Sequence, residues 1–481
     1  MDRKQRMATR KNQTVCRLNE SARALDKAML KAGVSSADKE SFLNWAISSL
    51  WSTFKDERMN QRIMIENEVR QLGLRFPNGT VKKEYSYSFQ LPVNKIDVIG
   101  LSGIDELGLT LEMGKPGEFF LTGKPQKSGD FTLKLRYTTV EGEPESELNI
   151  PIAFNPSPRD LWRNIPTDKD IQYYKEDSDT AYLKVEAGAD GTPRKDVVAA
   201  SQRGRSHAQE GKARDDHFSL FHCEESDWYI IAVADGAGSA KYSRKGSEVA
   251  CKTVVNHCKD LLVDNPDFEE AIRSFNAAPT DTGKRSILTN MVHEIVLKGA
   301  KKAHDRINEV ANGEEGLKPK DFATTLMFAI CKKYDFGWFI ASFWVGDGAM
   351  CLFDEKNKTA KLLGTPDEGE FSGQTRFLTM PEIFRTADVY NRLRMAIVPD
   401  FTALFLMSDG ISDPMFETDK NLNDYAKWEE FYNNLKNGFP DDEIGGVDLS
   451  DDNEAAKDQL LGWLNFWSPG NHDDRTIAIL Y

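Results

Sequence analysis

Apolar residues in the N-terminal part of the chain recur at helical spacing. One face carries four of them at intervals of three or four residues: Leu43, Ile47, Leu50 and Phe54. Ser35, with an acidic residue three positions later, is typical of a helix start. We therefore expect helices over 21–74, packed through this face in a small bundle.

The pattern changes to a period of two after about residue 81. Apolar and polar residues alternate in three segments: 85–89, 131–137 and 148–154. Such alternation is typical of strands with one buried face, and turns rich in glycine and proline separate the segments. We expect a small all-β sandwich over 76–156. The stretch FFLTGKPQKSGDFTLKLRY also resembles the strand–turn–strand of bacterial immunoglobulin-like modules.

The chain of 481 residues is long enough for two or three domains. Prolines and charged residues dominate 157–196, which we expect to be a linker with partial structure. The predicted organisation is a helical N-terminal segment at 1–75, the sandwich at 76–156, this linker, and a larger domain at 197–481.

Strongly apolar runs that stop at an aspartate recur in the last domain. Three of them end at an Asp-Gly pair: 228–234 before Asp235, 338–345 before Asp347, and 403–407 before Asp409. Two Asp-Asp pairs precede further apolar strands: Asp215-Asp216 and Asp473-Asp474. Because such runs are typical of central strands in a covered sheet, we expect their ends, and with them the aspartates, to meet at a shared edge.

Asp-Gly is also a common hairpin turn, so each motif taken alone has a purely structural interpretation. Two observations favour a binding site over three separate turns. The residues after Asp235 and Asp409 do not form a strand that could pair back. Aspartates gathered at one edge also repel each other unless cations bind there.

The candidate ligands are carboxylates, with no cysteine and little histidine nearby. Hard oxygen donors favour magnesium or manganese and exclude a structural zinc site. A glycine after each aspartate lets backbone carbonyls approach the ions closely. Two such cations can activate a bridging water and neutralise a phosphoryl group, so the pattern predicts metal-dependent phosphatase chemistry.

Composition excludes several other classes. A net charge of −14 argues against broad nucleic-acid binding, because a duplex would repel this surface. The six cysteines form no CxxC pair, which favours reduced, buried thiols. The sequence has no apolar run of membrane-spanning length and no secretory signal at its start, so we expect a cytoplasmic protein without a membrane partner.

The motifs of the last domain, in their order, resemble those of the PPM family, the metal-dependent serine/threonine phosphatases of type 2C. The matching positions are Asp216, Asp235-Gly236-Ala237-Gly238-Ser239, Thr324-Thr325-Leu326, Gly346-Asp347-Gly348, Ser408-Asp409-Gly410 and Asp473-Asp474-Arg475-Thr476. The opening GRSH followed by GKARDD is similar to a bacterial branch. The resemblance implies an α+β chain whose phosphatase part is a β-sandwich flanked by helices (αββα), with 246–262 and 287–310 as flanking helices.

The resemblance also implies a centre of two manganese or magnesium ions. Asp235 would bridge both ions, and the carbonyl of Gly236 would complete one of them. Asp409 and Asp473 would hold the first ion. In the implied reaction, a water bridging the two ions attacks phosphoserine or phosphothreonine.

The remaining aspartates have more distant implied roles. Asp216 would act through waters on the second ion, and Asp215 is a further candidate for this role. Asp347, together with Asp409, would hold a weaker third ion.

Two positions depart from the family pattern. Ala237 stands where many members carry a histidine that protonates the leaving oxygen, so general-acid help must come from elsewhere. Gly211 stands where a phosphate-binding arginine is expected. His207 is our candidate for this contact and for a catalytic role, with Lys212 and Arg214 as its rivals. The alternative for His207 is an ordinary loop residue.

The predicted function is hydrolysis of phosphoserine or phosphothreonine in a partner protein, opposite a serine/threonine kinase. An alternative is a pseudophosphatase that binds a phosphoprotein or a kinase without turnover. Loss of the metal aspartates would favour that alternative, yet all are present. A third interpretation makes 1–160 a docking module to which the phosphatase is subordinate.

Overall fold

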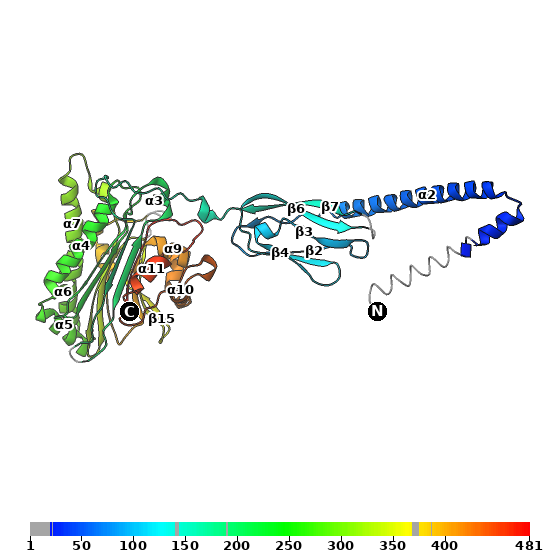
Figure 1. Cartoon of the computed structure of the whole chain (residues 1–481). Coiled ribbons are helices and arrows are strands. Elements are labelled where there is room, and N and C mark those ends of the chain that lie inside the picture. The colour runs from blue at the N-terminus through cyan, green and yellow to red at the C-terminus, as the bar shows by residue number, and fades with distance from the viewer. Residues whose placement is uncertain (1–19, 22, 140–143, 189–190, 368–374, 386) are drawn as a thin grey trace. The chain divides into compact units, whose positions relative to one another are not determined.

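The computed structural model describes residues 20–21, 23–139, 144–188, 191–367, 375–385 and 387–481. The chain divides into two compact units, Met1–Leu161 and Trp162–Tyr481 (Figure 1). The five cysteines within the described ranges are free and buried, as predicted, whereas Cys16 lies outside these ranges. Among the described helices, none is both long and apolar enough to cross a bilayer.

The first unit contains the long helix α2 (Ser36–Gln71). The side chain of Ser35 accepts a hydrogen bond from the backbone N–H of Asp38 at 3.1 Å, which confirms the predicted helix start. Val69, near the C-terminal end of α2, packs into the core of the sandwich. Leu50, on the predicted packing face, is 71% exposed. The predicted bundle is therefore wrong for the described residues, because this helix finds its packing partner at its C-terminal end.

The rest of the first unit is a β-sandwich, as predicted. Its strands are β1 (Gly79–Thr80), β2 (Tyr85–Gln90), β3 (Asp97–Ser102), β4 (Leu109–Met113), β5 (Glu118–Gly123), β6 (Gly129–Thr138) and β7 (Ser146–Asn155). They form two sheets, ordered β1-β7-β6-β3 and β2-β5-β4. Leu121, Leu135 and Ile150 point inward and are fully buried, which confirms the alternating pattern. The immunoglobulin-like detail stays a prediction.

The second unit is built on two larger sheets. The five-stranded sheet has the order β10 (His217–His222), β11 (Trp228–Ala234), β12 (Leu326–Tyr334), β13 (Gly337–Val345) and β16 (Leu393–Val398). The six-stranded sheet has the order β15 (Thr359–Leu362), β14 (Ala349–Asp354), β17 (Ala403–Met407), β18 (Arg475–Leu480), β9 (Val197–Gln202) and β8 (Ser178–Leu183). Residues such as Ile231, Ile340 and Leu404 fill the space between the two sheets.

Helices cover both outer faces of this sandwich (Figure 1). The five-stranded sheet packs against α4 (Ser243–Leu262), α5 (Pro266–Ala277), α6 (Thr282–Val292), the π-helix η3 (His293–Leu297) and α7 (Lys298–Asn312). The six-stranded sheet packs against α9 (Asp409–Phe416), α10 (Tyr425–Asn437) and α11 (Ala456–Trp463). The predicted α+β class and the helix-flanked sandwich are confirmed, including the flanking helices expected at 246–262 and 287–310.

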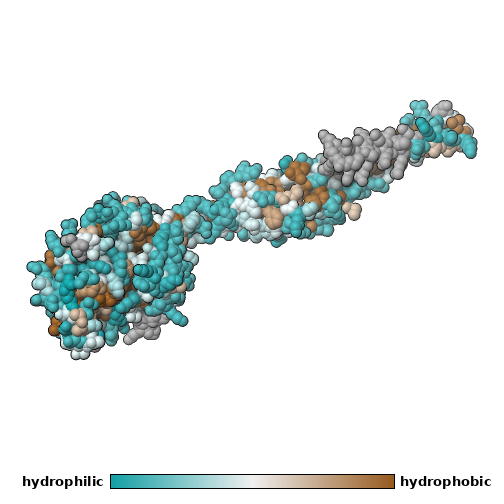
Figure 2. Space-filling model, turned by 90° about the horizontal axis from the view of Figure 1, so that it is seen from below, coloured by the Kyte–Doolittle hydropathy of each residue, from teal (hydrophilic) through white to brown (hydrophobic). Residues whose placement is uncertain are grey.

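Shorter elements complete the two units. They are α3 (Arg205–Glu210), α8 (Glu382–Arg385) and the 3-10 turns η1 (Asp105–Leu107), η2 (Pro158–Leu161), η4 (Pro319–Phe322), η5 (Ala387–Arg392), η6 (Asp419–Asn423) and η7 (Pro440–Asp442). Strand β8 lies within the range 157–196 that we predicted as a linker, and it pairs with β9 along its whole length. The larger unit presents a mostly hydrophilic face in Figure 2, in keeping with its buried apolar residues.

The aspartate-ended runs form strands close to the predicted positions, but they do not share one sheet. Strands β11 and β13 belong to the five-stranded sheet, whereas β17 belongs to the six-stranded sheet. The expectation of one shared edge is therefore wrong. Asp235, Asp347 and Asp409 instead approach one another from two sheets, because both sheets end at the same side of the sandwich.

Removing residues 1–161 should leave a second unit that folds by itself. Its cores are made by its own residues, whereas Val69 and its neighbours pack in a separate core. The expected result for residues 162–481 is a single cooperative thermal transition, measured by circular dichroism. A gradual, non-cooperative loss of signal would contradict the division into two units.

Candidate metal centre

Asp235 follows β11 directly, and a pair of threonines fixes its backbone. The N–H of Asp235 donates to Thr325 Oγ1 at 2.8 Å, and its carbonyl accepts from Thr324 Oγ1 and from the N–H of Thr325, both at 2.8 Å. A Cβ at the next residue, Gly236, would lie 2.7 Å from the carbonyl oxygen of Asp215. A side chain at Gly236 would push these two aspartate loops apart, which explains the glycine of this Asp-Gly motif.

Asp347 sits in the sharp turn between β13 and β14. Gly346, which precedes it, has a φ of 120°, a conformation that favours glycine. The N–H of Gly346 donates to Asp367 Oδ2 at 2.9 Å, so the turn is anchored from outside the strands. Thr375 Oγ1 donates to Asp347 Oδ2 and orients that carboxylate.

Asp409 is the first residue of α9, and the preceding Ser408 ties three strand ends together. Ser408 Oγ donates to Asp216 Oδ2 at 2.8 Å and accepts from the N–H of Thr476 at 3.0 Å. The N–H of Ser408 donates to the carbonyl of Thr476 at 2.9 Å. The end of β17 and the starts of β18 and β10 are thereby fixed relative to one another.

These loops bring three carboxylates together. One oxygen each from Asp235, Asp347 and Asp409 lies within 4.8 Å of the other two. At that separation two negative charges repel by about 3 kcal/mol at an effective dielectric constant of about 20. Three such pairs would cost about 10 kcal/mol, which is comparable to the whole stability of a typical domain. The three groups therefore cannot all stay ionised without compensating positive charge.

The pKa values of these aspartates reflect the same repulsion. Burial first, and then the neighbouring Asp409 and Asp216 carboxylates, raise the pKa of Asp235 well above its usual range. Burial and the Asp347 carboxylate do the same to the pKa of Asp409. Burial and Asp474 raise the pKa of Asp216 to about 7. A divalent cation would remove this penalty and restore the charged form.

Unpartnered oxygens at the centre fit a cation as well. The buried Oδ1 atoms of four carboxylates have no hydrogen-bond partner within the described ranges: Asp215, Asp216, Asp347 and Asp409. A buried acceptor without a partner costs free energy, and carboxylate oxygens are the ligands that magnesium and manganese prefer. The residues present therefore suit divalent cations.

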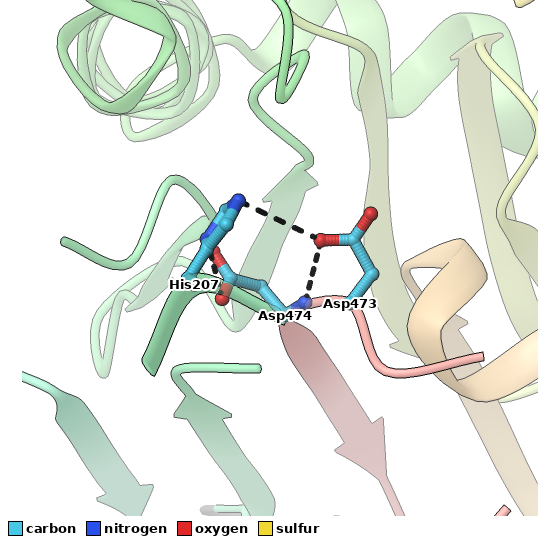
Figure 3. Close-up of side chains that lie close together, drawn as sticks. All are labelled: His207, Asp473 and Asp474. Carbon is cyan, nitrogen blue, oxygen red and sulfur yellow. Dashed lines mark hydrogen bonds and ion pairs between the residues drawn. The ribbon is translucent and has the colours of Figure 1, made fainter. Parts of the chain in front are cut away.

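A second cluster consists of His207, Asp473 and Asp474 (Figure 3). The charge of Asp473 also acts on Asp235, but this cluster has a different character from the first. Both oxygens of Asp474 are occupied by donors. Oδ1 accepts from His207 Nδ1 at 3.0 Å and from the N–H of Gly204 at 2.6 Å, and Oδ2 accepts from the N–H of Asp215 at 2.5 Å. This donor set makes Asp474 a structural anion that joins three loops, not a cation ligand.

Charge pairing accounts for the protonation of this cluster. Burial alone would lower the pKa of His207, but the hydrogen bond and charge of Asp474 raise it to about 9. Burial would likewise raise the pKa of Asp474, yet His207 and the backbone N–H groups lower it. Paired with Asp474 in this way and without bound cations, His207 favours the imidazolium form at neutral pH. Its Nε2 lies 3.9 Å from Asp215 Oδ2 and 4.0 Å from Asp473 Oδ1.

The two rivals of His207 lie in other surroundings. Lys212 Nζ pairs with Glu210 at 2.6 Å, and its side chain is half exposed. Arg214 is almost completely buried, and its Nε donates to the carbonyl of Glu176 at 3.2 Å. The predicted aspartates and His207 therefore lie close together, whereas neither rival has a contact with the Asp235 cluster among the described residues.

Sequence reasoning missed two acidic residues of this region. The sequence motif places Asp474 beside Asp473 but assigns it no role of its own. Asp413 lies one helical turn after Asp409 on α9, and burial together with Asp347 raises its pKa to about 6. The signal for Asp413 was its spacing of four residues from Asp409, which places both on one side of a helix.

The fold and this centre define a class of protein: a helix-flanked sandwich of two sheets with an acidic, cation-binding centre. The family model "Protein phosphatase 2C" matches residues 203–464, which is more than half of the 481 residues. The chain belongs to the protein phosphatase 2C family. A search of curated protein sequences found no match.

Several solved structures are similar to the chain at low identity. A bacterial serine phosphatase is 12% identical over 59% of this chain and 96% of its own, with a TM-score of 0.34. The Mycobacterium tuberculosis serine/threonine phosphatase PstP/Ppp is 15% identical over 60% and 98%, with a TM-score of 0.34. RsbX in complex with magnesium is 15% identical over 63% and 100%, with a TM-score of 0.32.

Manganese added to metal-free protein should raise its melting temperature, because cations relieve the repulsion among the carboxylates. Asp409→Asn should raise the melting temperature of the metal-free protein by about 2–4 °C per kcal/mol of repulsion relieved, and should abolish most of the manganese effect. Differential scanning fluorimetry measures both. Asp264→Asn, at an exposed position, is the control. An unchanged melting temperature of metal-free Asp409→Asn would contradict the electrostatic argument.

Proposed function

We propose that the chain hydrolyses phosphoserine and phosphothreonine in proteins with the help of two divalent cations, manganese or magnesium. The observation that carries this proposal is the set of converging carboxylates of Asp235, Asp347 and Asp409, with unpartnered buried oxygens, in a chain of the protein phosphatase 2C family. Within this family the natural partner is a phosphorylated protein, and a serine/threonine kinase supplies its phosphate. We propose the cytoplasm as the place of action.

Each aspartate has a role in this proposal. Asp235 would serve both cations, and the carbonyl of Gly236 would serve one of them. Asp409 and Asp473 would hold the first cation, and Asp216 would act on the second through waters. Cations bound there supply an activated water and neutralise the charge of the phosphoryl group. The protein's own contribution is to hold these oxygens in place before substrate arrives, through the threonine and serine contacts behind them.

The roles of two further aspartates are more peripheral. Asp215 lies beside Asp216 on the same loop, and its Oδ1, which accepts no hydrogen bond within the described ranges, would accept one from a water of the second cation. Asp347 and Asp409, with Asp413 one turn further along α9, would hold a third, weaker cation.

His207 is proposed as the phosphate contact. Its Nδ1 is engaged by Asp474, which leaves Nε2–H directed toward the side of Asp215 and Asp473, at distances beyond a hydrogen bond. An imidazolium in this place can donate to a phosphate oxygen. Ala237 lies where a histidine would serve as general acid, so the proton of the leaving oxygen must come from another group, such as a cation-bound water.

Asp235→Asn should lower the turnover of an aryl phosphate by about three orders of magnitude or more, because several kcal/mol of charge stabilisation is lost and each 1.4 kcal/mol is tenfold. The variant should remain folded, and a chelator should abolish activity of the parent protein. Asp264→Asn is the matched control. Near-normal turnover by Asp235→Asn at saturating manganese, or full activity in chelator, would contradict the proposal and leave a metal-free mechanism. No turnover by the folded parent protein with manganese would instead leave the binding-only pseudophosphatase.

His207→Ala should raise the Michaelis constant for aryl phosphate about tenfold, the equivalent of one charge-assisted hydrogen bond, with little change in manganese affinity. Steady-state kinetics and calorimetric manganese titration measure the two effects. His293→Ala, on the far helix layer, is the control. Unchanged kinetics would point to Lys212 or Arg214, and weaker manganese binding alone would make His207 a residue that only positions the loop.

A further inference from the structure

A segment before the region matched by the family model runs against the loop that carries Asp215 and Asp216. This segment, 162–177, is called the strap here. The N–H of Ile165 donates to the carbonyl of Ala208 at 2.8 Å, and Thr167 Oγ1 donates to the carbonyl of Lys212 at 3.2 Å. The strap therefore lies along both α3 and the loop 212–216 that follows it.

Arg203 fixes the two ends of the strap to the sandwich. Its Nη2 donates to Asn164 Oδ1 at 2.7 Å and pairs with Asp177 Oδ2 at 3.0 Å. The N–H of Arg203 donates to the carbonyl of Asp177 at 2.7 Å. Because Arg203 directly follows β9, the strap is held by a rigid element on the same side as the metal centre.

Lys175 reaches from the strap to the backbone of the two aspartates. Its Nζ donates to the carbonyl of Asp216 at 2.9 Å and to Ser247 Oγ at 3.2 Å. Ser247 Oγ in turn donates to the carbonyl of Asp215 at 2.5 Å. The amino group of Lys175 and one hydroxyl group thus hold both peptide carbonyls of the Asp-Asp pair.

Arg244, at the start of α4, joins the strap to the side chain of Asp215. Its Nε and Nη2 donate to the strap carbonyls of Tyr173 and Gln172 at 3.0 and 2.7 Å. Its Nη1 lies 4.0 Å from Asp215 Oδ1, the oxygen that has no hydrogen-bond partner in the described part of the chain. Arg244 therefore stands between the strap and one candidate cation ligand.

The loop 212–216 has no regular secondary structure, so hydrogen bonds from outside must fix its conformation. We propose that the strap is a positioning element of the metal centre, in which Lys175 and Arg244 set the place of Asp215 and Asp216 for the second cation. This inference rests on the proposed function, because it takes these two carboxylates as the ones that serve that cation.

Groups that orient metal ligands from behind change metal affinity by about 10- to 100-fold when they are lost. A purely structural strap would instead change overall stability and leave metal affinity as it is. The manganese affinity of the folded protein therefore separates the two roles.

The test compares Lys175→Met with Lys169→Met in the full chain. Methionine keeps the apolar stem and removes the donating amino group, and Lys169 is an exposed lysine of the same strap. Titration calorimetry with manganese alone, without substrate, should show the weaker of two sites loosened about 10- to 100-fold in Lys175→Met and unchanged in Lys169→Met. Turnover of aryl phosphate by Lys175→Met should recover at high manganese, with the Michaelis constant for the ester unchanged.

Wild-type manganese affinity in folded Lys175→Met would overturn the inference, as would equal loss in Lys169→Met. If Lys175→Met does not fold, Arg244→Gln undergoes the same titration, and wild-type affinity there overturns it. Failure of the proposed function is distinguishable, because the unaltered protein would then show no manganese-dependent hydrolysis at all.

Discussion

Carboxylates that repel one another converge where the two sheets of the second unit end, and the surrounding loops are arranged to keep them there. Asp235, Asp347 and Asp409 come from three different strand ends and two different sheets. None of the three could relax away without breaking contacts to Thr325, Thr375 or the Ser408 junction. The fold thus holds a high local negative potential that bound divalent cations would neutralise.

Neutral and paired groups around the carboxylates supply the necessary rigidity. Asp474 has its charge balanced by His207 and by backbone N–H groups, so it can sit fully buried next to the acidic cluster without adding to the repulsion as an isolated charge would. Two serine hydroxyl groups add further hydrogen bonds between segments. Ser408 binds Asp216, which lies more than a hundred residues earlier in the chain, and Ser247 of helix α4 binds the loop at Asp215. Carboxylates therefore have two opposite roles in this centre. Those of the acidic cluster are available to cations, whereas that of Asp474 is closed off by its hydrogen bonds.

The sequence predicted those features of the fold that depend on local residue patterns. Long apolar runs ending at Asp-Gly marked β11, β13 and β17, and the resemblance placed them in a helix-flanked sandwich. It did not predict that Asp409 approaches from the other sheet, because strand order depends on contacts between distant segments. The exposed face of α2 and the strap were missed for related reasons. Helical spacing does not name a packing partner, and no motif distinguishes Lys175 from any other lysine in a charged segment.

Strand β8 affects how long a fragment of the chain must be to stay soluble. It covers the outer side of β9, which in turn covers β18, whose six residues are all buried. A fragment cut at the limits of the family match, 203–464, would lose all three strands and leave β17 as a bare apolar edge. Open edges of this kind pair with other molecules, so such a fragment would aggregate. A soluble fragment of this unit therefore has to extend well beyond the region that the family model matches.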